Sequence, residues 1–501
     1  MVNEKINNVA GNFSLPDGRE VFGTLDVRGE ASKVLFFDDK QFSPGDEAYN
    51  YITGELYDGR RVSLIQNTLI GTGCRFTGTG AEKCWAEVFP HYVTVGSAHV
   101  SASEACVEVI TFAMEDASVV IYDFDAFSTV LDTASFIPLL RRDKMKYREV
   151  QFGEHPIIGY FTGKFEIVSV DTLLGEVRAE HRPSFTSGGP SGFRIDNRLV
   201  LILKPLNPVF FEEAMQRLLV LLRFFELLAG REQPLTELSL SLAGQSDQSM
   251  PIEVYRSFAP QPRSEDDPLS ANRPHPADVL VSTRDDSKEY STVLKNYLES
   301  DIERHDARVR IHYNLKNHRR YTIDRLIAAV NVFDVFPDTA YPISAPLSPE
   351  LTAATNEARL LFRVLPDSLE RSSVLGALGR VGKLSLKHKI QHRVQSTGLY
   401  KHFPKFIDVL KEAVNCRNHY VHGTKGRIDY SENFEIVCFF TDALEFAFAA
   451  ADLIDAGWNI EAWISSRPGR SHLFGVFIAE YAHRLRDFEK MMGAETKSSN
   501  R

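Results

Sequence analysis

The chain has 501 residues, of which 43% are hydrophobic and 25% are charged, and its formal net charge is −10. These proportions are typical of a globular protein and exclude a collagen-like, a wholly disordered or a small disulfide-stapled protein. At roughly 100–200 residues per domain the length allows about three domains. A net acidic charge also argues against a nucleic-acid partner, unless the positive charges are concentrated in one segment.

The charges are unevenly distributed. Residues 1–140 contain 9 Lys and Arg against 20 Asp and Glu, a net charge of −11. Residues 371–430 contain 12 Lys and Arg against 3 Asp and Glu, a net charge of +9, with five of the 15 histidines. The total therefore combines two unlike segments, of which the basic one suits RNA. A further hypothesis is that the acidic segment opposes the access of RNA until a trigger moves it.

The N-terminal half has the pattern of a β-rich structure. Short runs of β-branched and aromatic residues alternate with turn signals such as Leu15-Pro16-Asp17-Gly18 and Tyr57-Asp58-Gly59. Asp-Gly between such runs is a strong hairpin signal, so we predict a sandwich or barrel-like β domain over residues 1–170. A β-rich continuation over residues 171–257 is interrupted by an amphipathic helix at 210–228, which Gly230 ends.

Helical periodicity dominates the C-terminal half. Five prolines over residues 258–276 predict an exposed linker or loop, followed by a helical connecting region over 277–341 and an all-α bundle over 342–493. A tail follows at 494–501, and the fold class is α+β multidomain. Helices are expected at residues 289–303, 323–333, 350–362, 368–381, 403–422, 434–456 and 473–491.

The cysteines and the apolar runs indicate a cytoplasmic protein. The five cysteines are odd in number and none forms a Cys-x-x-Cys pair, which predicts free thiols in a reducing compartment: Cys74, Cys84, Cys106, Cys416 and Cys438. The N-terminal residues lack the apolar core of a signal peptide. The most hydrophobic run, residues 434–454, contains four acidic residues, which favours a buried bundle helix over a membrane span.

The helix expected at residues 403–422 carries an arginine on its apolar side. At 100° per residue, Phe406, Leu410, Ala413 and Val421 lie within about 40° of the direction of Arg417. The guanidinium is therefore expected to point into the apolar face. There it needs a carboxylate, a phosphate or an interface to offset its desolvation.

A polar stripe runs beside this face and consists of Lys411, Asn415, Asn418 and His422. Gly423 predicts the end of the helix and places His422 in the last turn, where the backbone can redirect its ring. Arg417 and His422 are about 140° apart on an ideal helix. They converge on one ligand only after such a redirection, or across a dimer of two such helices.

These residue types suit RNA cleavage without a metal or another cofactor. An imidazole can remove the ribose 2′-OH proton or protonate the departing 5′-oxygen, and a guanidinium can stabilise the charge of the phosphorane. Because the 2′-OH is the nucleophile, the chemistry is confined to RNA. We therefore predict Arg417 and His422 as catalytic residues, with Asn418 orienting one of them or the phosphate.

The spacing Arg-x4-His is weak evidence by itself, because about one occurrence is expected by chance in a chain of this length. A second copy, Arg467 to His472, contains proline and glycine and is expected in a loop. On spacing alone, an Arg that pairs with a core acid and a His that caps a helix explain the motif equally well.

Two segments resemble a known family. The run Arg417-Asn418-His419-Tyr420-Val421-His422 resembles the Arg-polar-x-x-x-His motif of HEPN domains, which are all-α nuclease or nucleotide-binding bundles. The runs Gly11-Asn12-Phe13-Ser14-Leu15-Pro16-Asp17 and Ile52-Thr53-Gly54-Glu55-Leu56 resemble the N-terminal domain of the ApeA family of abortive-infection proteins. The resemblance implies a β-rich N-terminal part before an ApeA-type HEPN domain. It further implies an RNase of bacterial anti-phage defence whose composite site is formed by two HEPN domains.

Basic residues near the motif are the expected RNA contacts, and they comprise Lys383, Lys387, Lys389, Arg393, Lys401, Lys405 and His419. A second basic stretch, residues 304–320, is equally compatible with an RNA contact and with a solvated helix face. Expected partners are RNA, with tRNA as one candidate, a second copy of the chain in a homodimer or higher oligomer, and a phage-derived trigger protein. No membrane partner is expected.

Three functions remain open. The first is a metal-independent RNA endonuclease that infection activates. The second is a non-catalytic protein of the same defence setting, whose helical domain binds RNA or a nucleotide without cutting it. The third, a DNA-directed nuclease, is disfavoured because the sequence shows no constellation of metal ligands.

Overall fold

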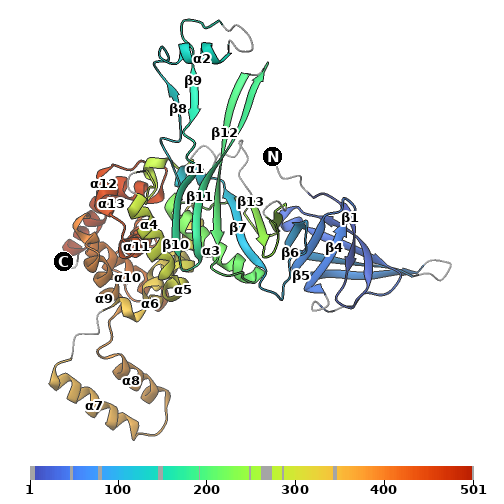
Figure 1. Cartoon of the computed structure of the whole chain (residues 1–501). Coiled ribbons are helices and arrows are strands. Elements are labelled where there is room, and N and C mark those ends of the chain that lie inside the picture. Colours follow the sequence, from blue (N-terminus) through green and yellow to red (C-terminus); the bar gives the residue numbers. More distant parts are fainter. Residues whose placement is uncertain are drawn as a thin grey trace. The chain divides into compact units, whose positions relative to one another are not determined.

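The computed structural model describes residues 6–43, 45, 49–76, 82–144, 151–190, 192–246, 250–260, 273–284, 287–341 and 347–498 (Figure 1). The chain forms two compact units, Met1–Leu298 and Glu299–Arg501. The first is β-rich and the second is helical, which confirms the expected fold class. Residues 261–272 of the expected linker and residues 499–501 of the expected tail lie outside the described residues.

The first six strands close into a barrel. They are β1 (Val9–Ser14), β2 (Glu20–Asp26), β3 (Lys33–Asp38), β4 (Tyr51–Leu56), β5 (Arg61–Phe76) and β6 (Glu82–Gly96). Antiparallel pairing runs in the order β6-β3-β2-β1-β4-β5, and β5 pairs again with β6. The side chains that alternate inward fill the centre, with Phe13 and Phe36 packed edge to face. Of the two expected architectures, sandwich and barrel, the strand order selects the barrel.

Two hairpins of this barrel form at the Asp-Gly signals. Gly18 and Gly59 have φ of 83° and 85°, a left-handed conformation that favours glycine. In each turn the residue after glycine donates its backbone N–H to the preceding aspartate, Arg19 to Asp17 and Arg60 to Asp58, both at 3.0 Å. The predicted β1–β2 and β4–β5 hairpins are thereby confirmed.

The barrel strand β6 also extends into an open sheet. Beyond the residues that pair with β3, residues 92–95 of β6 pair with β14. The sheet continues as β14-β13-β7-β12-β11-β10. Its strands are β7 (Val107–Met114), β10 (Glu166–Thr172), β11 (Gly175–Gly189), β12 (Gly192–Lys204), β13 (Leu235–Leu242) and β14 (Ile252–Arg256). The boundary expected at residue 170 was wrong, because it falls inside β10.

Short elements and one long helix complete this unit. The short elements are α1 (Ala117–Val120), β8 (Phe127–Val130), α2 (Ile137–Lys144) and β9 (Ile158–Phe161), with β8 and β9 paired as a separate hairpin. Helix α3 (Phe211–Ala229) contributes Leu218, Leu221 and Phe224 to the core, and it ends at Gly230, whose φ is 69°. This agrees with the helix predicted at 210–228. Helix α4 (Ser287–Glu299) packs Tyr297 against Phe224.

One expectation about the cysteines was wrong. Cys74 and Cys84 are directly opposite each other on β5 and β6 and form a disulfide. Cys106, Cys416 and Cys438 are free thiols, as expected. The odd number and the spacing did not disclose the bond because it depends on the register of two paired strands.

The second unit is a helical bundle. It contains α5 (Asp301–Lys316), α6 (Ile323–Val335), α7 (Pro349–Arg363), α8 (Leu369–Arg380), α9 (Leu386–Ser396), α10 (Phe406–His422), α11 (Phe434–Ala456), α12 (Ile460–Ser465) and α13 (Leu473–Ser498). All seven predicted helices have a counterpart, but the helix expected at 289–303 is two helices that meet near Ser300.

The helical unit begins earlier than expected. Helix α6 packs against α10 and α11, so it belongs to the bundle and not to a connecting region that ends at residue 341. Pro342 and Pro346, which suggested that boundary, lie outside the described residues. The packing of α6 against α10 and α11, and not the position of these prolines in the sequence, decides the domain to which α6 belongs.

Helix α11 is the buried bundle helix that the run at 434–454 predicted. Its acidic side chains are compensated by arginines: Arg308 Nε lies 2.8 Å from Asp452 Oδ2, and Arg325 Nη2 lies 2.7 Å from Glu445 Oε2. Arg304 also pairs with Asp452 at 2.6 Å. The first residues of the basic stretch 304–320 are thus used inside the bundle. No helix among the described residues is long and apolar enough to cross a membrane.

Candidate active site

Helix α10 places the three predicted catalytic side chains at its C-terminal end. Phe406, Leu410 and Ala413 are buried, as the helical periodicity predicted. Val421 is 41% exposed, because the apolar face does not continue to the last turn. Arg417 is therefore half-buried, at the edge of the core, and a ligand can approach the end of the helix.

The end of α10 turns His422 toward Arg417. Gly423 is the C-cap with φ of 66°, and its N–H donates to the carbonyl of His419 at 2.9 Å. This is the helix end that the sequence predicted. Arg417 Nη1 lies 3.2 Å from His422 Nε2. Of the two ways for these residues to meet, redirection within one chain and pairing across a dimer, the structure shows the first.

All hydrogen-bond partners of the Arg417 guanidinium are neutral. Nη1 donates to Asn418 Oδ1 at 3.1 Å as well as to His422, and Nη2 donates to Asn331 Oδ1 at 3.0 Å. Nε is buried and has no partner in the described part of the chain. No carboxylate among the described residues pairs with this arginine. Its positive charge is therefore oriented but not neutralised, a state that favours binding of an anion.

The contact with Asn331 was missed by sequence reasoning. Asn331 lies on α6, 86 residues before Arg417, within the apolar run Ile327-Ala328-Ala329-Val330-Asn331-Val332-Phe333. A single amide within such a run is a signal that a polar group is needed in the core, because buried amides require hydrogen-bond partners. The sequence does not disclose which partner it meets.

The contact of Arg417 Nη1 with His422 Nε2 also specifies a protonation pattern. A guanidinium can only donate hydrogen bonds, so His422 Nε2 must accept and carry no proton in this arrangement. The neighbouring His419 is turned away from the cluster, since its Nδ1 lies 2.8 Å from the carbonyl of Thr424. His419 lies instead beside the ring of Tyr430.

The second Arg-x4-His copy has a different role. His472 is buried, and its Nδ1 accepts the backbone N–H of Phe474 at 3.0 Å in the first turn of α13. Arg467 is exposed, before the start of that helix. This copy is a helix cap, and it lacks the side-chain cluster that Arg417 organises.

Apart from His419, the predicted RNA-contact residues divide into three groups. Lys383 and Lys401 are exposed. Lys387 and Lys405 line a cavity beside α10. The last group serves the bundle itself: Arg393 is buried and lies 2.6 Å from Asp455, and Lys389 lies near Asp334 and over the ring of Tyr341. Because Arg393 is buried, it is not available for the surface contact that the sequence predicted.

Comparison with known families assigns both parts of the chain. Residues 8–297 match the family model of ApeA N-terminal domain 1, and residues 327–462 match the family model of the Apea-like HEPN domain. The second match begins in α6, so it includes Asn331 together with α10. No curated protein and no solved structure shows a significant match to the chain.

Proposed function

We propose that this chain, which belongs to the ApeA family through its N-terminal domain and its Apea-like HEPN domain, is a metal-independent RNA endonuclease of bacterial anti-phage abortive-infection defence. The observation that carries the proposal is the cluster at the end of α10. There Arg417, with only neutral partners, contacts both Asn418 and His422.

The proposed reaction is an intramolecular displacement in RNA. The ribose 2′-oxygen loses its proton to a general base and attacks the adjacent phosphorus. The bond from phosphorus to the 5′-oxygen breaks, and a general acid protonates that oxygen. The products are a 2′,3′-cyclic phosphate and a 5′-hydroxyl, and no other reactant is required. A general base and a general acid each contribute typically 10²–10⁴-fold to the rate of such a reaction.

When RNA binds, Arg417 can give up its hydrogen bond to His422 and donate to a phosphate instead. In the structure, Arg417 Nη1 donates to the lone pair of His422 Nε2. A phosphate that approaches the cluster is a stronger acceptor for the guanidinium than a neutral imidazole. If the hydrogen bond donated by Arg417 Nη1 shifts from His422 Nε2 to a phosphate oxygen, His422 Nε2 becomes free to take the proton of the 2′-OH. Asn418 and Asn331 would keep the guanidinium oriented during this exchange.

The second proton transfer requires another group. Among the described residues, one chain contributes a single imidazole to the cluster, whereas the reaction requires both a base and an acid. We propose that His422 of a second copy supplies the other role in a homodimer or a higher oligomer. A phage-derived protein would act as the trigger, and tRNA is one candidate substrate.

Cleavage in the presence of EDTA tests the proposal. Full-length protein is incubated with total RNA and EDTA, and products are followed by gel and by detection of 2′,3′-cyclic phosphate ends. Arg417→Ala should lower the rate about 10²–10³-fold and His422→Ala about 10²–10⁴-fold. Arg467→Ala is the matched control, because Arg467 is exposed and belongs to the other copy of the spacing.

Three outcomes would reject the assignment. The first is cleavage that both cluster variants leave unchanged. The second is cleavage of RNA whose 2′-hydroxyls are methylated, because such RNA lacks the nucleophile. The third is RNA binding that weakens with salt while the RNA stays intact under all conditions, which would identify the non-catalytic RNA-binding protein instead.

A further inference from the structure

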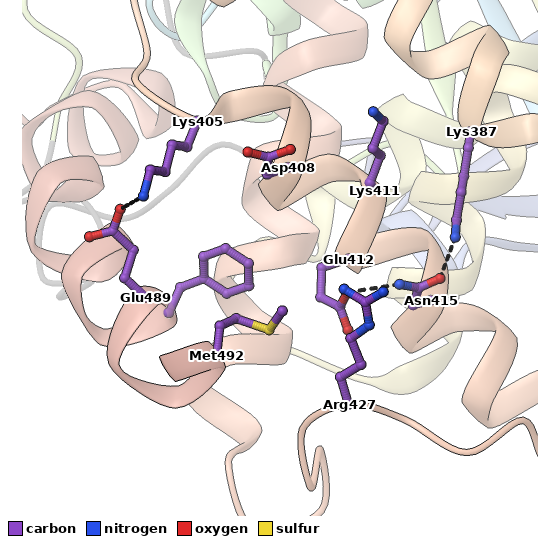
Figure 2. Close-up of a pocket in the computed structure, with 10 residues that line it drawn as sticks. Lys387, Lys405, Asp408, Lys411, Glu412, Asn415, Arg427, Glu489 and Met492 are labelled. Carbon is purple, nitrogen blue, oxygen red and sulfur yellow. Dashed lines mark hydrogen bonds and ion pairs between the residues drawn. The ribbon is translucent and has the colours of Figure 1, made fainter. Parts of the chain in front are cut away.

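A cavity of about 410 Å³ lies beside α10 (Figure 2). The residues of α10 that line it precede the catalytic cluster in the sequence. Helices α9, α10 and α13 and the loop after α10 contribute its walls. Among the lining residues are Lys387, Lys411, Asn415, Arg427, Phe488 and Met492. Lys405 and the carboxylates of Asp408, Glu412 and Glu489 complete the lining, so the wall combines four cations, three carboxylates, an amide and two apolar side chains.

One side of the cavity is a fixed hydrogen-bond network. Asn415 Nδ2 donates to Glu412 Oε2 at 2.7 Å, and Lys387 Nζ donates to Asn415 Oδ1 at 2.5 Å (Figure 2). Glu412 is buried, and its other oxygen accepts the hydroxyl of Tyr430 at 2.7 Å. A buried carboxylate therefore fixes the amide, and the amide fixes Lys387. Such a network holds polar groups in one orientation before a ligand arrives.

Three of the four cations that line the cavity have no acidic partner among the described residues. Lys405 lies 2.6 Å from Glu489, so this pair is neutral in sum. Lys387, Lys411 and Arg427 form no ion pair with any residue that the structure describes, and Lys387 donates only to the amide of Asn415. Arg427 is exposed and Lys411 is half-buried at the cavity. Asp408 also lines the cavity and offsets part of this positive charge. Lys387 is engaged by Asn415, whereas Lys411 and Arg427 have no hydrogen-bond partner among the described residues and therefore suit a phosphate.

Helix α13 contributes two apolar side chains to the cavity, beside Glu489 of the pair with Lys405. Phe488 is buried on α13, where its ring packs edge to face with Phe440, and Met492 follows one turn later. A planar base can lie against these side chains, while an amide such as Asn415 reads the hydrogen-bonding edge of the base. Cations, an amide and two apolar side chains together suit one nucleotide.

The cavity and the catalytic cluster occupy successive turns of one helix. Lys411, Asn415, Asn418 and His422 form a single stripe along α10. Lys411 precedes Arg417 by six residues, about 9 Å along the helix axis. A polynucleotide that places one phosphate at Arg417 therefore brings a neighbouring nucleotide to the cavity.

We propose that this cavity is the subsite for a nucleotide of the RNA substrate next to the cleaved phosphodiester. The inference rests on the proposed nuclease function and adds a determinant of specificity to it. Lys411 and Arg427 hold the phosphate, Phe488 and Met492 support the base, and Asn415 reads its edge. A free nucleotide has the same chemistry, but the shared stripe on α10 favours a nucleotide that is continuous with the cleaved strand.

The first experiment measures RNA binding without cleavage. Full-length Arg417→Ala protein is titrated, in EDTA and at several NaCl concentrations, into a fluorescein-labelled 20-nucleotide RNA of random sequence. Adding Lys411→Ala together with Arg427→Ala should weaken binding at least tenfold and lower the salt slope by about 0.7 for each phosphate that is no longer neutralised. Lys425→Ala is the matched control, because Lys425 is an exposed cation of the same loop that does not line the cavity. If Lys425→Ala weakens RNA binding as much as the double variant does, the proposed subsite is wrong.

The second experiment concerns the base. Met492→Trp fills the apolar side of the cavity without touching Arg417, Asn418 or His422. Sequencing the products of a random RNA pool should show a changed nucleotide preference beside the cut, while circular dichroism shows an unchanged melting temperature. An unchanged preference would overturn the role of the cavity in reading the base.

A third arm separates the two sources of a nucleotide. AMP, GMP, CMP and UMP are each added to the RNA-binding assay, and competition only at millimolar concentration is expected. A mononucleotide that binds tightly, loses affinity in the Lys411 and Arg427 variants and does not displace RNA would overturn the proposal and make the cavity an effector site.

The two proposals can fail separately. If wild-type protein leaves RNA intact but RNA binding depends on Lys411 and Arg427, the nuclease assignment fails and the cavity stands as an RNA-binding subsite. If wild-type protein cleaves RNA and no cavity variant changes binding or preference, the subsite alone fails.

Discussion

Arg417 Nη1 lies 3.2 Å from His422 Nε2, although an ideal helix would separate the directions of these side chains by about 140°. The contact is possible because His422 is the last residue of α10 and Gly423 reverses the backbone there. The guanidinium is also held by Asn418 on the same helix and by Asn331 on α6. The C-terminal end of α10 and the neighbouring helix α6 thus form the cluster together.

For cleavage, the planar guanidinium of Arg417 with its several N–H donors is predicted to matter more than its positive charge. In Arg417→Lys the charge remains, but one ammonium cannot contact Asn331, Asn418 and His422 in the same geometry. We expect the cleavage rate to fall about 10²-fold while the dissociation constant for RNA stays within a few-fold of wild type. Single-turnover cleavage and anisotropy measure the two quantities, and a fully active lysine variant would contradict the prediction.

Asn331 is predicted to position Arg417. Asn331→Ala removes one acceptor from the guanidinium and should lower kcat about tenfold with little change in KM. Asn331→Asp places a carboxylate beside the guanidinium, where it competes with the RNA phosphate, so we expect a larger loss that includes a higher KM. A purely structural role would affect both variants through stability alone. Equal kinetics in the two variants would therefore rule out the positioning role.

Gly423 is predicted to support both the fold and the orientation of His422. Its φ of 66° is costly for a β-branched residue and tolerated by asparagine. Gly423→Val should lower the free energy of unfolding by about 1–2 kcal/mol, and it should also lower the cleavage rate because it displaces His422. Gly423→Asn should retain most of the stability and most of the cleavage rate. Urea unfolding and cleavage assays on the pair test this, and similar behaviour of Val and Asn would argue against it.

Asp452 is predicted to be essential for the stability of the helical unit. It is 2% exposed and compensates Arg308 and Arg304. Asp452→Asn keeps the shape but leaves buried positive charge, which should lower the free energy of unfolding by about 3–5 kcal/mol. Asp487→Asn is the control, because Asp487 is half-exposed and its removal should change stability by no more than about 1 kcal/mol. Urea denaturation of the full chain compares the two.

The ion pairs of Asp452 with Arg308 and Arg304 also predict how the stability of the protein depends on pH. Burial by itself would raise the pKa of Asp452, but Arg308 and Arg304 outweigh it and hold the pKa below the ordinary value of 3.8. A carboxyl whose folded-state pKa is lowered contributes stability above its unfolded pKa and loses it as the pH falls through the folded value. The stability difference between wild type and Asp452→Asn should therefore be constant from pH 7 to about pH 5 and shrink below pH 4. A difference that grows on acidification would contradict this sign.

Local signals in the sequence determined most of the elements of this protein. The Asp-Gly turns predicted two barrel hairpins, and Gly230 and Gly423 predicted two helix ends, since both kinds of signal depend on the backbone of a few adjacent residues. The four acids within residues 434–454 predicted a buried helix and not a membrane span. The motif on α10 was also local, because helical periodicity places Arg417 beside the core.

Only the tertiary structure decided which groups meet. The disulfide of Cys74 and Cys84 depends on strand register, and the use of Arg393 and Arg308 inside the bundle depends on the acids that other helices bring to them. Asn331 reaches Arg417 across 86 residues of sequence because α6 packs against α10. A sequence pattern records how each helix presents its side chains, whereas the partner of a buried charge is decided by the packing of elements that are distant in the chain.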